Sequence, residues 1–268
     1  MKYQFSLGGG MGDVFNHMVM DDAYAQLDNL KPEDTCDIFL NCHNPFIKEM
    51  FEWHPKKAQL NVIWHGYWMS GEEMDKRRQH GIFTQDNTPP GPKGEVKFYP
   101  SDKDRRILDA LKDKKVIVIQ ATAGCADRDI PLDQMDIMLN DLRGTGFTAV
   151  GIGRNYQRSD RYGEFTYEKY PWVVSMVDQL SIPGTVELVR QSAGVIACHS
   201  CICLMARHFR KPNILTLPRA INHINGIGRG ENNQWTFGLF QPETRLVYSE
   251  DYSMVKMAEL LNLAKGEK

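Results

Sequence analysis

The residues between Phe5 and Met18, FSLGGGMGDVFNHM, place one carboxylate directly after a glycine-rich stretch. A strand-like run ends in three consecutive glycines, and Gly12 and Asp13 then precede a helical pattern. Glycine allows a ligand to approach the backbone closely, and a helix start gathers N–H donors. Asp13 is therefore either a helix N-cap or an acid–base group beside a ligand. In the second interpretation Gly10 and Gly12 line the space that the ligand occupies.

A second group of polar residues follows two apolar runs in the other half of the chain. Arg128 lies in the loop after KVIVIQA, and His199, Ser200 and Cys201 follow GVIAC. Ligands of open α/β sheets bind at the carboxyl ends of strands, and helix N-termini attract anions. Arg128 is therefore a solvated loop cation or a diphosphate ligand. Ser200 is an N-cap or a phosphate contact.

The sequence CHSCIC, from Cys198 to Cys203, also suggests a zinc site. Structural zinc sites usually set paired cysteines two residues apart on a turn and take a second pair from elsewhere. These cysteines instead span an apolar strand-to-helix junction. We therefore expect reduced, buried thiols that act as small apolar groups.

Aromatic and basic residues alternate in the tract WHGYWMSGEEMDKRRQHG, residues 64–81. Such a tract can stack on sugars or bases and hold phosphates. His65, Trp68 and Arg77 are the candidate contacts for a second substrate. The alternative is an irregular loop whose tryptophans pack inward and whose charges are solvated.

The composition of the 268 residues is typical of a globular protein, with 42% hydrophobic residues, 25% charged residues and a formal net charge of −2. This balance gives no global basic field, so a nucleic-acid partner needs a local patch. We expect no membrane span and no secretory leader, and therefore a cytoplasmic protein.

Short apolar runs alternate with helical patterns, which predicts parallel sheets in an α/β fold. The predicted strands are 2–7, 36–42, 59–64, 115–121, 147–152, 194–198 and 212–217. The predicted helices are 14–28, 45–53, 101–112, 132–143, 184–192, 200–210 and 250–264. We expect two Rossmann-like domains, 1–112 and 113–268, that face each other across a cleft. The C-terminal helix packs on either domain or bridges both.

Taken in order, these motifs resemble glycosyltransferase family nine, the heptosyltransferase-like enzymes of the GT-B fold. The resemblance rests on the strand that ends in Gly-x-Gly-Asp, on the basic residue before Pro131, and on TVELVRQSAGVIACHSCICLMARHFRKPNILTL. It covers residues 1–30 and 112–218, whereas residues 65–100 have no match. It implies an N-terminal acceptor domain and a C-terminal domain for a nucleotide-sugar donor.

The resemblance also implies roles for single residues. Asp13 corresponds to the catalytic carboxylate, Arg128 to a cation that neutralises donor phosphate, and Ser200 to a diphosphate contact. His199 stands where the family has Asp, Cys201 where it has Gly, and Leu204 where it has His.

The implied reaction is inverting, metal-independent sugar transfer from a nucleoside-diphosphate sugar, with no other cofactor. No Asp-x-Asp sequence stands at a strand end in a metal-binding context. The acceptor is a glycan, such as a lipopolysaccharide-like molecule, or a modified nucleic-acid base.

Two further function classes stay open. Gly8-x-Gly10-x-x-Asp13 partly imitates a dinucleotide fingerprint, which is typical of a Rossmann-like nucleotide-sugar epimerase or dehydrogenase. The third glycine of that fingerprint is missing. A catalytically inactive GT-B module that binds a nucleotide or glycan is the non-enzyme alternative.

Overall fold

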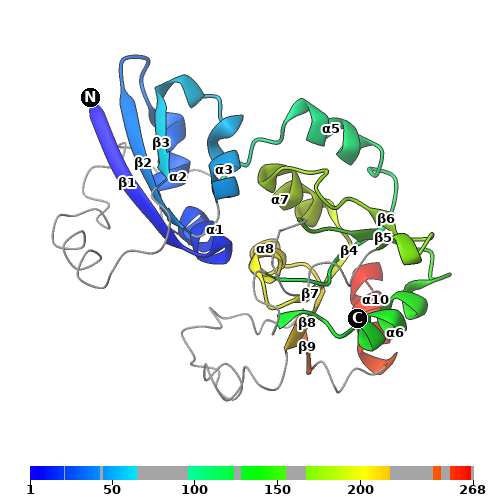
Figure 1. Cartoon of the computed structure of the whole chain (residues 1–268). Helices are drawn as coiled ribbons and strands as arrows, with labels where there is room; N and C mark the ends of the chain where they lie inside the picture. Colours follow the sequence, from blue (N-terminus) through cyan, green and yellow to red (C-terminus); the bar gives the residue numbers. More distant parts are fainter. Residues whose placement is uncertain are drawn as a thin grey trace. The chain divides into compact units, whose positions relative to one another are not determined.

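The computed structural model of the chain describes residues 1–20, 22–42, 45–64, 96–123, 128–154, 167–217, 244–248 and 254–266. The chain folds into two compact units (Figure 1). Unit 1 comprises Met1–Asp102 and Ser181–Gly184, and unit 2 comprises Lys103–Leu180 and Thr185–Lys268. The units divide at residues 102 and 103, whereas the expected boundary lay at 112 and 113. The acceptor and donor roles of the two units stay predictions.

Unit 1 contains a parallel sheet with the strand order β1-β2-β3. Its strands are β1 (Lys2–Gly9), β2 (Thr35–Cys42) and β3 (Leu60–Trp64). The described helices between them are α1 (Met11–Met20), α2 (Asp22–Gln26), η1 (Leu27–Asn29), η2 (Pro45–Lys48), α3 (Glu49–Glu52) and η3 (Lys57–Gln59). β1 and β2 are each followed by helical turns, which connect them to the next parallel strand.

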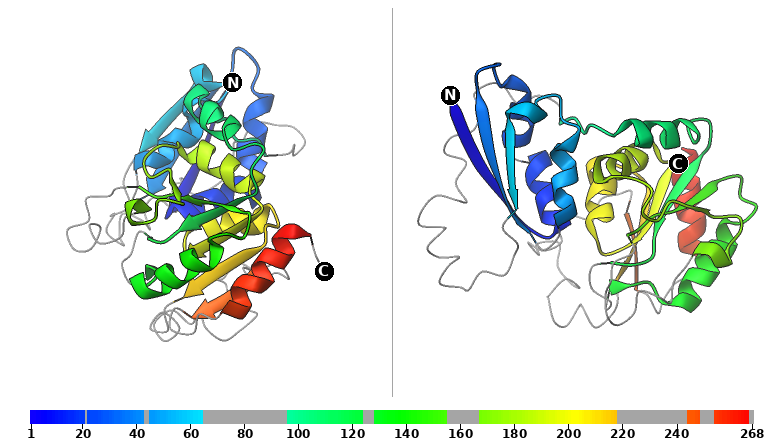
Figure 2. Two further views of the ribbon diagram at one scale, coloured as in Figure 1. Left: turned by 90° about the vertical axis from the view of Figure 1, so that its right-hand side faces the viewer. Right: turned by 45° about the horizontal axis from the view of Figure 1, so that its top comes forward.

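The two faces of this sheet differ in burial. Tyr3, Phe5 and Leu7 of β1 are buried, as are Ile38 and Leu40 of β2. The alternate positions of both strands are less buried on average, which is the period-two pattern of a sheet packed on one side. Figure 2 shows the helices of unit 1 gathered on one side of the sheet, in agreement with this pattern.

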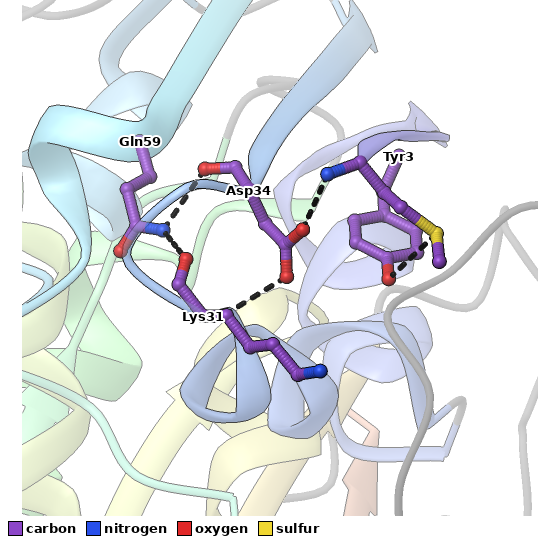
Figure 3. Close-up of polar contacts among 5 residues, drawn as sticks. Tyr3, Lys31, Asp34 and Gln59 are labelled. Carbon is purple, nitrogen blue, oxygen red and sulfur yellow. Dashed lines mark hydrogen bonds and ion pairs between the residues drawn. The ribbon is translucent and has the colours of Figure 1, made fainter.

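A polar network fixes the amino end of the sheet in unit 1 (Figure 3). Asp34 accepts a hydrogen bond from the Met1 ammonium group at 2.5 Å and another from Lys31 N at 3.0 Å. Gln59 Nε2 donates to the Asp34 carbonyl oxygen at 2.9 Å and to the carbonyl oxygen of Lys31. The hydrogen bond from the ammonium group lowers the pKa of Asp34. This network joins the start of β1 to the residues that precede β2 and β3.

Unit 2 contains a parallel sheet with the strand order β6-β5-β4-β7-β8-β9. Its strands are β4 (Val116–Gln120), β5 (Thr148–Gly151), β6 (Val174–Ser175), β7 (Gly194–Cys198), β8 (Asn213–Leu217) and β9 (Thr244–Tyr248). The described helices are α5 (Asp102–Asp109), α6 (Leu132–Leu142), η5 (Tyr167–Lys169), α7 (Ile182–Gln191), α8 (Cys201–His208) and α10 (Met254–Lys265). The sequence predicted all of these strands except β6 and β9.

Helices cover both faces of the sheet in unit 2. Met135 and Leu139 of α6 and Leu260 of α10 pack in one core with Ile119 and Ile196. Figures 1 and 2 show α7 and α8 on the other side of the sheet. All five residues of β7 are buried, as expected for a central strand covered twice. The C-terminal helix α10 therefore packs on unit 2. None of the helices in the described ranges has both the length and the apolar character needed to cross a membrane.

Candidate functional site

The strand order of unit 2 reverses between β4 and β7. The chain runs from β4 outward to β5 and β6, and then returns to place β7 on the other side of β4. The two strands pair in parallel, with Gln120 opposite Ala197. Such a reversal opens a crevice outside the carboxyl ends of the two strands, where open α/β sheets bind ligands. The candidate site of unit 2 is built from residues at this edge.

Ser200 connects the ends of the two central strands. It has an extended backbone and is the N-cap of α8, where its hydroxyl oxygen accepts a hydrogen bond from Ile202 N at 3.3 Å. The same hydroxyl donates to Gln120 Oε1 at the end of β4. The N-cap interpretation of Ser200 is therefore confirmed, and the contact with Gln120 is an additional role. Its role as a phosphate contact stays a prediction.

His199 lies beside this contact and lacks a hydrogen-bond partner for one ring nitrogen. Its Nδ1 atom is buried and has no such partner within the described part of the chain. Burial, together with the positive charge of Arg128, lowers the pKa of His199 to about 4. The imidazole is therefore neutral near pH 7, and a bound ligand can hydrogen-bond to Nδ1 without competing with a protein group.

Arg128 belongs to a loop that hydrogen bonds hold against the end of β4. Asp129 Oδ1 accepts a hydrogen bond from Ala123 N at 2.7 Å, and Ile130 N donates to the carbonyl oxygen of Ala121 at 2.8 Å. These two contacts close the loop on both sides of Arg128. The half-buried Arg128 lies close enough to His199 to affect its titration. Arg128 thus lies in the loop that follows β4, and His199 and Ser200 directly follow β7, the neighbouring strand. Their joint role in binding a ligand stays a prediction.

Tyr167 supports the same edge from within the core. Its hydroxyl donates to the carbonyl oxygen of Ile119 at 3.0 Å and accepts from Ala121 N at 3.3 Å. A Cβ atom on Gly151 would lie 2.6 Å from the Tyr167 ring, so only glycine fits beneath it. The sequence analysis identified neither Gln120 nor Tyr167 as part of this edge. The polar end of the run VIVIQ was a possible signal for Gln120, whereas nothing in the sequence marked Tyr167.

Cys198 and Cys203 are buried thiols, and Cys201 is partly exposed. Cys203 Sγ donates to the carbonyl oxygen of Cys198 at 3.1 Å. Burial raises the pKa of Cys201 and of Cys203 to about 12 and also raises that of Cys198. The three cysteines carry free thiols, and no metal-binding group of three or more His, Cys, Asp or Glu residues occurs in the described ranges. Cys201 is the first residue of α8, and its role in donor binding stays a prediction.

The glycine-rich stretch of unit 1 differs from the expected turn. Gly8 and Gly9 belong to β1 and pair with Asn41 and Cys42 of β2. Val14 N donates to the Gly10 carbonyl oxygen at 3.1 Å, so α1 begins at residue 11 and Gly10 holds the N-cap position. The predicted helix start at residue 14 and the N-cap interpretation of Asp13 are therefore wrong. Glycine is an acceptable N-cap, so the helix starts without help from a side chain.

Asp13 is the third residue of α1 and lies in its first turn, next to Gly12. The proposed acceptor contacts His65, Trp68 and Arg77 lie outside the described residues. The neighbouring Trp64 is 40% exposed, and its indole Nε1 donates to the Cys42 carbonyl oxygen at 2.9 Å.

No family model matches the chain, and no curated protein matches it in sequence. Solved structures match its fold over nearly the full length. The Escherichia coli ADP-heptose lps heptosyltransferase II aligns with a TM-score of 0.59 at 12% identity, over 100% of this chain and 99% of its own. The E. coli heptosyltransferase WaaC with ADP aligns with a TM-score of 0.57 at 10% identity, over 98% of this chain and 100% of its own.

A glycosyl transferase family 9 protein from Veillonella parvula DSM 2008 aligns with a TM-score of 0.56 at 7% identity, over 99% of this chain and 98% of its own. The predicted resemblance to this family is thus confirmed at the level of the fold. The chain has the parallel α/β, GT-B-like fold of the heptosyltransferases and of glycosyltransferase family nine.

Proposed function

We propose that the protein is a glycosyltransferase that moves a sugar from a nucleoside-diphosphate donor to an acceptor hydroxyl. One observation carries the proposal: the segments with Arg128 and with His199 and Ser200 follow the carboxyl ends of β4 and β7, where the strand order of unit 2 reverses. This is the position at which open α/β sheets bind nucleotides. The full-length match to heptosyltransferase folds supports the same reaction class.

Unit 2 holds the donor in this proposal. The Arg128 guanidinium and the N-terminal amides of α8 provide positive charge and N–H donors for the diphosphate. The neutral His199 contacts an uncharged part of the donor, and Gly10 and Gly12 leave space for its sugar. One of the matching structures contains ADP, which makes ADP and ADP-sugars the first ligands to test.

Unit 1 supplies the general base in this proposal. The acceptor hydroxyl oxygen attacks the anomeric carbon, and the bond between that carbon and the diphosphate oxygen breaks. The nucleoside diphosphate leaves with the electron pair, and Asp13 takes the acceptor proton. Attack from the side opposite the leaving group inverts the anomeric configuration. The acceptor is a glycan or a modified nucleic-acid base, contacted by His65, Trp68 and Arg77.

The donor site is tested by Arg128→Ala. Losing one charge-assisted contact to phosphate costs roughly 1.5–3 kcal/mol, so ADP affinity by calorimetry is expected to fall about 10- to 150-fold. The matched control is Arg143→Ala, because the Arg143 guanidinium lies 4.7 Å from the centroid of the Trp172 ring in the same unit. We expect Arg143→Ala to leave ADP affinity unchanged. Equal affinities of wild type and Arg128→Ala would remove Arg128 from the site.

The catalytic step is tested by Asp13→Asn. The amide keeps the shape of the side chain but cannot take the proton, so turnover is expected to fall roughly 10²–10⁴-fold while donor affinity stays near wild type. The assay is nucleotide release from the UDP-, ADP-, GDP- or CMP-sugar that stabilises the wild type most strongly in a thermal shift. Asp133→Asn, in the first turn of α6, controls for the loss of a helix-dipole contact, which is worth about 0.3–1 kcal/mol.

The same experiment separates the enzyme from the inactive binding module. Wild-type turnover in a folded Asp13→Asn variant would contradict the proposed base. ADP binding without release of nucleotide from any donor sugar, in the presence of saccharide acceptors, would favour the binding module. NAD binding would favour the epimerase or dehydrogenase alternative.

A further inference from the structure

Asn41 is buried in unit 1, and among the described residues neither polar atom of its side chain has a hydrogen-bond partner. It is the second-to-last residue of β2 and is 4% exposed. Both Oδ1 and Nδ2 lack a partner within the described residues. An asparagine amide has two donor hydrogens and two acceptor lone pairs, and leaving all of them unused in the interior is strongly unfavourable. Native proteins rarely keep such a group without a use for it.

The register of β1 and β2 places this amide on the same face of the sheet as Ser6 and Phe39. Register pairs Asn41 with Gly8, which presents no side chain at that position. Ser6 lies two residues before Gly8 on β1, and Phe39 lies two residues before Asn41 on β2. Because side chains alternate along a strand, Ser6 lies on the same face as Asn41. The Ser6 Oγ atom is also buried without a partner. Two polar groups without partners among the described residues therefore lie beside Gly8, which has no side chain.

At the amino end of the sheet, the polar side chains on this face are paired with one another. Asp37 lies four residues before Asn41 on β2 and therefore on the same face. Its carboxylate contacts Lys2 Nζ at 2.8 Å and accepts from Asn61 Nδ2 at 3.1 Å. The polar side chains are thus paired at the amino end of the sheet and unpaired at the carboxyl end. The carboxyl end is also the edge from which the first turn of α1, with Asp13, begins.

We propose that Asn41, together with Ser6, binds hydroxyl groups of a saccharide acceptor. This inference rests on the proposed function and specifies which residues of unit 1 recognise the acceptor. An amide that needs both donors and acceptors is best satisfied by hydroxyl groups, because each hydroxyl donates and accepts. A phosphate or carboxylate only accepts and leaves the Asn41 Oδ1 atom without a donor. The ligand is therefore a neutral, polyhydroxylated sugar.

The test uses Asn41→Leu, which keeps the branched shape of the side chain and removes its polar atoms. Removing an unpaired buried amide is expected to raise the unfolding temperature of the ligand-free protein by roughly 2–4 °C. The same change is expected to abolish saturation transfer in NMR from the protein to glucose, galactose, mannose, N-acetylglucosamine and lactose. Asn61→Leu is the matched control, because Asn61 is exposed and already paired with Asp37. We expect it to keep the saccharide signals.

Asn41→Ala provides a second variant if the leucine does not pack. It also removes the amide and is expected to lose the saccharide signals with a smaller gain in unfolding temperature. A lower unfolding temperature of both variants, with saccharide signals kept, would show that protein or water already satisfies the amide. Wild-type protein without a signal from any of the five saccharides would overturn the proposal, as would binding of a single-stranded oligonucleotide instead.

ADP binding and saccharide binding are measured separately, so the acceptor site can be refuted while the donor site stands. The ADP affinity of wild type and of Arg128→Ala reports on unit 2 alone. Asn41→Leu is expected to leave that affinity unchanged. A protein with an intact ADP site and no contribution of Asn41 to saccharide binding therefore overturns only the acceptor assignment.

Discussion

Ser200 offers a quantitative test of the candidate donor site, because its hydroxyl makes two contacts. It accepts from Ile202 N at 3.3 Å and donates to Gln120 Oε1. Ser200→Ala removes an N-cap, at a cost of about 1 kcal/mol. It also removes a side-chain hydrogen bond with a net contribution of about 1 kcal/mol. The free energy of unfolding of unit 2 is therefore expected to fall by about 2 kcal/mol.

A double-mutant cycle separates these two contributions. Ser200→Ala, Gln120→Leu and the double variant are compared by urea denaturation, and the coupling energy is expected to be about 1 kcal/mol. The capping contribution is independent of Gln120 and stays outside the coupling energy. The one hydroxyl hydrogen of Ser200 is donated to Gln120 Oε1, so a contact with phosphate, which only accepts, exchanges one hydrogen bond for another. ADP affinity of Ser200→Ala is therefore expected to fall by about tenfold or less.

Ser192→Ala is the matched control for the hydroxyl itself. The buried Ser192 Oγ donates to the Val189 carbonyl oxygen at 2.9 Å, at the end of α7. We expect this variant to lose about 1 kcal/mol of stability and to keep its ADP affinity. A coupling energy near zero would refute the contact between Ser200 and Gln120. Unchanged ADP affinity in Ser200→Ala would refute its role at the phosphate.

Two further predictions concern side chains whose pKa values are shifted by burial. The pKa of the buried His54 is lowered to about 4, chiefly by burial, and its Nδ1 accepts from Lys56 N at 3.1 Å. The unfolded chain binds a proton that the folded chain does not between pH 6.5 and about 4, so stability falls as pH falls through this window. Urea denaturation is expected to show about 2 kcal/mol less stability at pH 5 than at pH 7 from this group. His54→Asn keeps an acceptor for Lys56 N and is expected to lose that part of the pH dependence; an unchanged dependence would contradict the assignment. Cys201 and Cys203, with pKa values of about 12, are expected to resist iodoacetamide at pH 8 in the native protein and to react in urea. Peptide mass spectrometry measures this, and rapid native labelling of Cys203 would contradict it.

The sequence predicted the central strands because their burial leaves a simple pattern. VIVIQ and GVIAC are almost uninterrupted apolar runs, as expected for parallel strands covered on both faces. The two strands that escaped prediction lack this pattern. β6 has two residues, and β9, TRLVY, carries an arginine and stands at the end of the strand order. Edge strands need less apolar surface, so periodicity identifies them poorly.

The start of α1 was misjudged for a different physical reason. A run of glycines usually indicates a turn, yet Gly8 and Gly9 continue β1 through backbone pairing with β2. Pairing partners lie more than thirty residues away and leave no local signal. The same limit applies to Gln120 and Ser200, which are 80 residues apart. Their contact depends on the return of β7 to the side of β4, and strand order is not encoded in local sequence.

The two candidate binding regions differ in how far the protein satisfies its own polar groups. At the edge of unit 2, Ser200 binds Gln120 and Asp129 binds Ala123 N, so the polar framework is fixed before a ligand arrives. Such preorganisation avoids a reorganisation cost when charge develops on a leaving diphosphate. In unit 1, three polar atoms of Asn41 and Ser6 are buried without partners among the described residues, whereas in unit 2 the same holds for one atom at this edge, His199 Nδ1.

This difference determines what each ligand contributes to stability. A donor that binds unit 2 stabilises the protein through its own affinity, and where it contacts His199 it also gives the buried Nδ1 atom a partner. A sugar that reaches Asn41 also relieves a penalty already present in the folded chain. Binding sites often contain residues that destabilise the ligand-free protein. Such residues contribute affinity once the ligand is bound. The gain in unfolding temperature of Asn41→Leu therefore measures how much stability unit 1 gives up to keep this amide available.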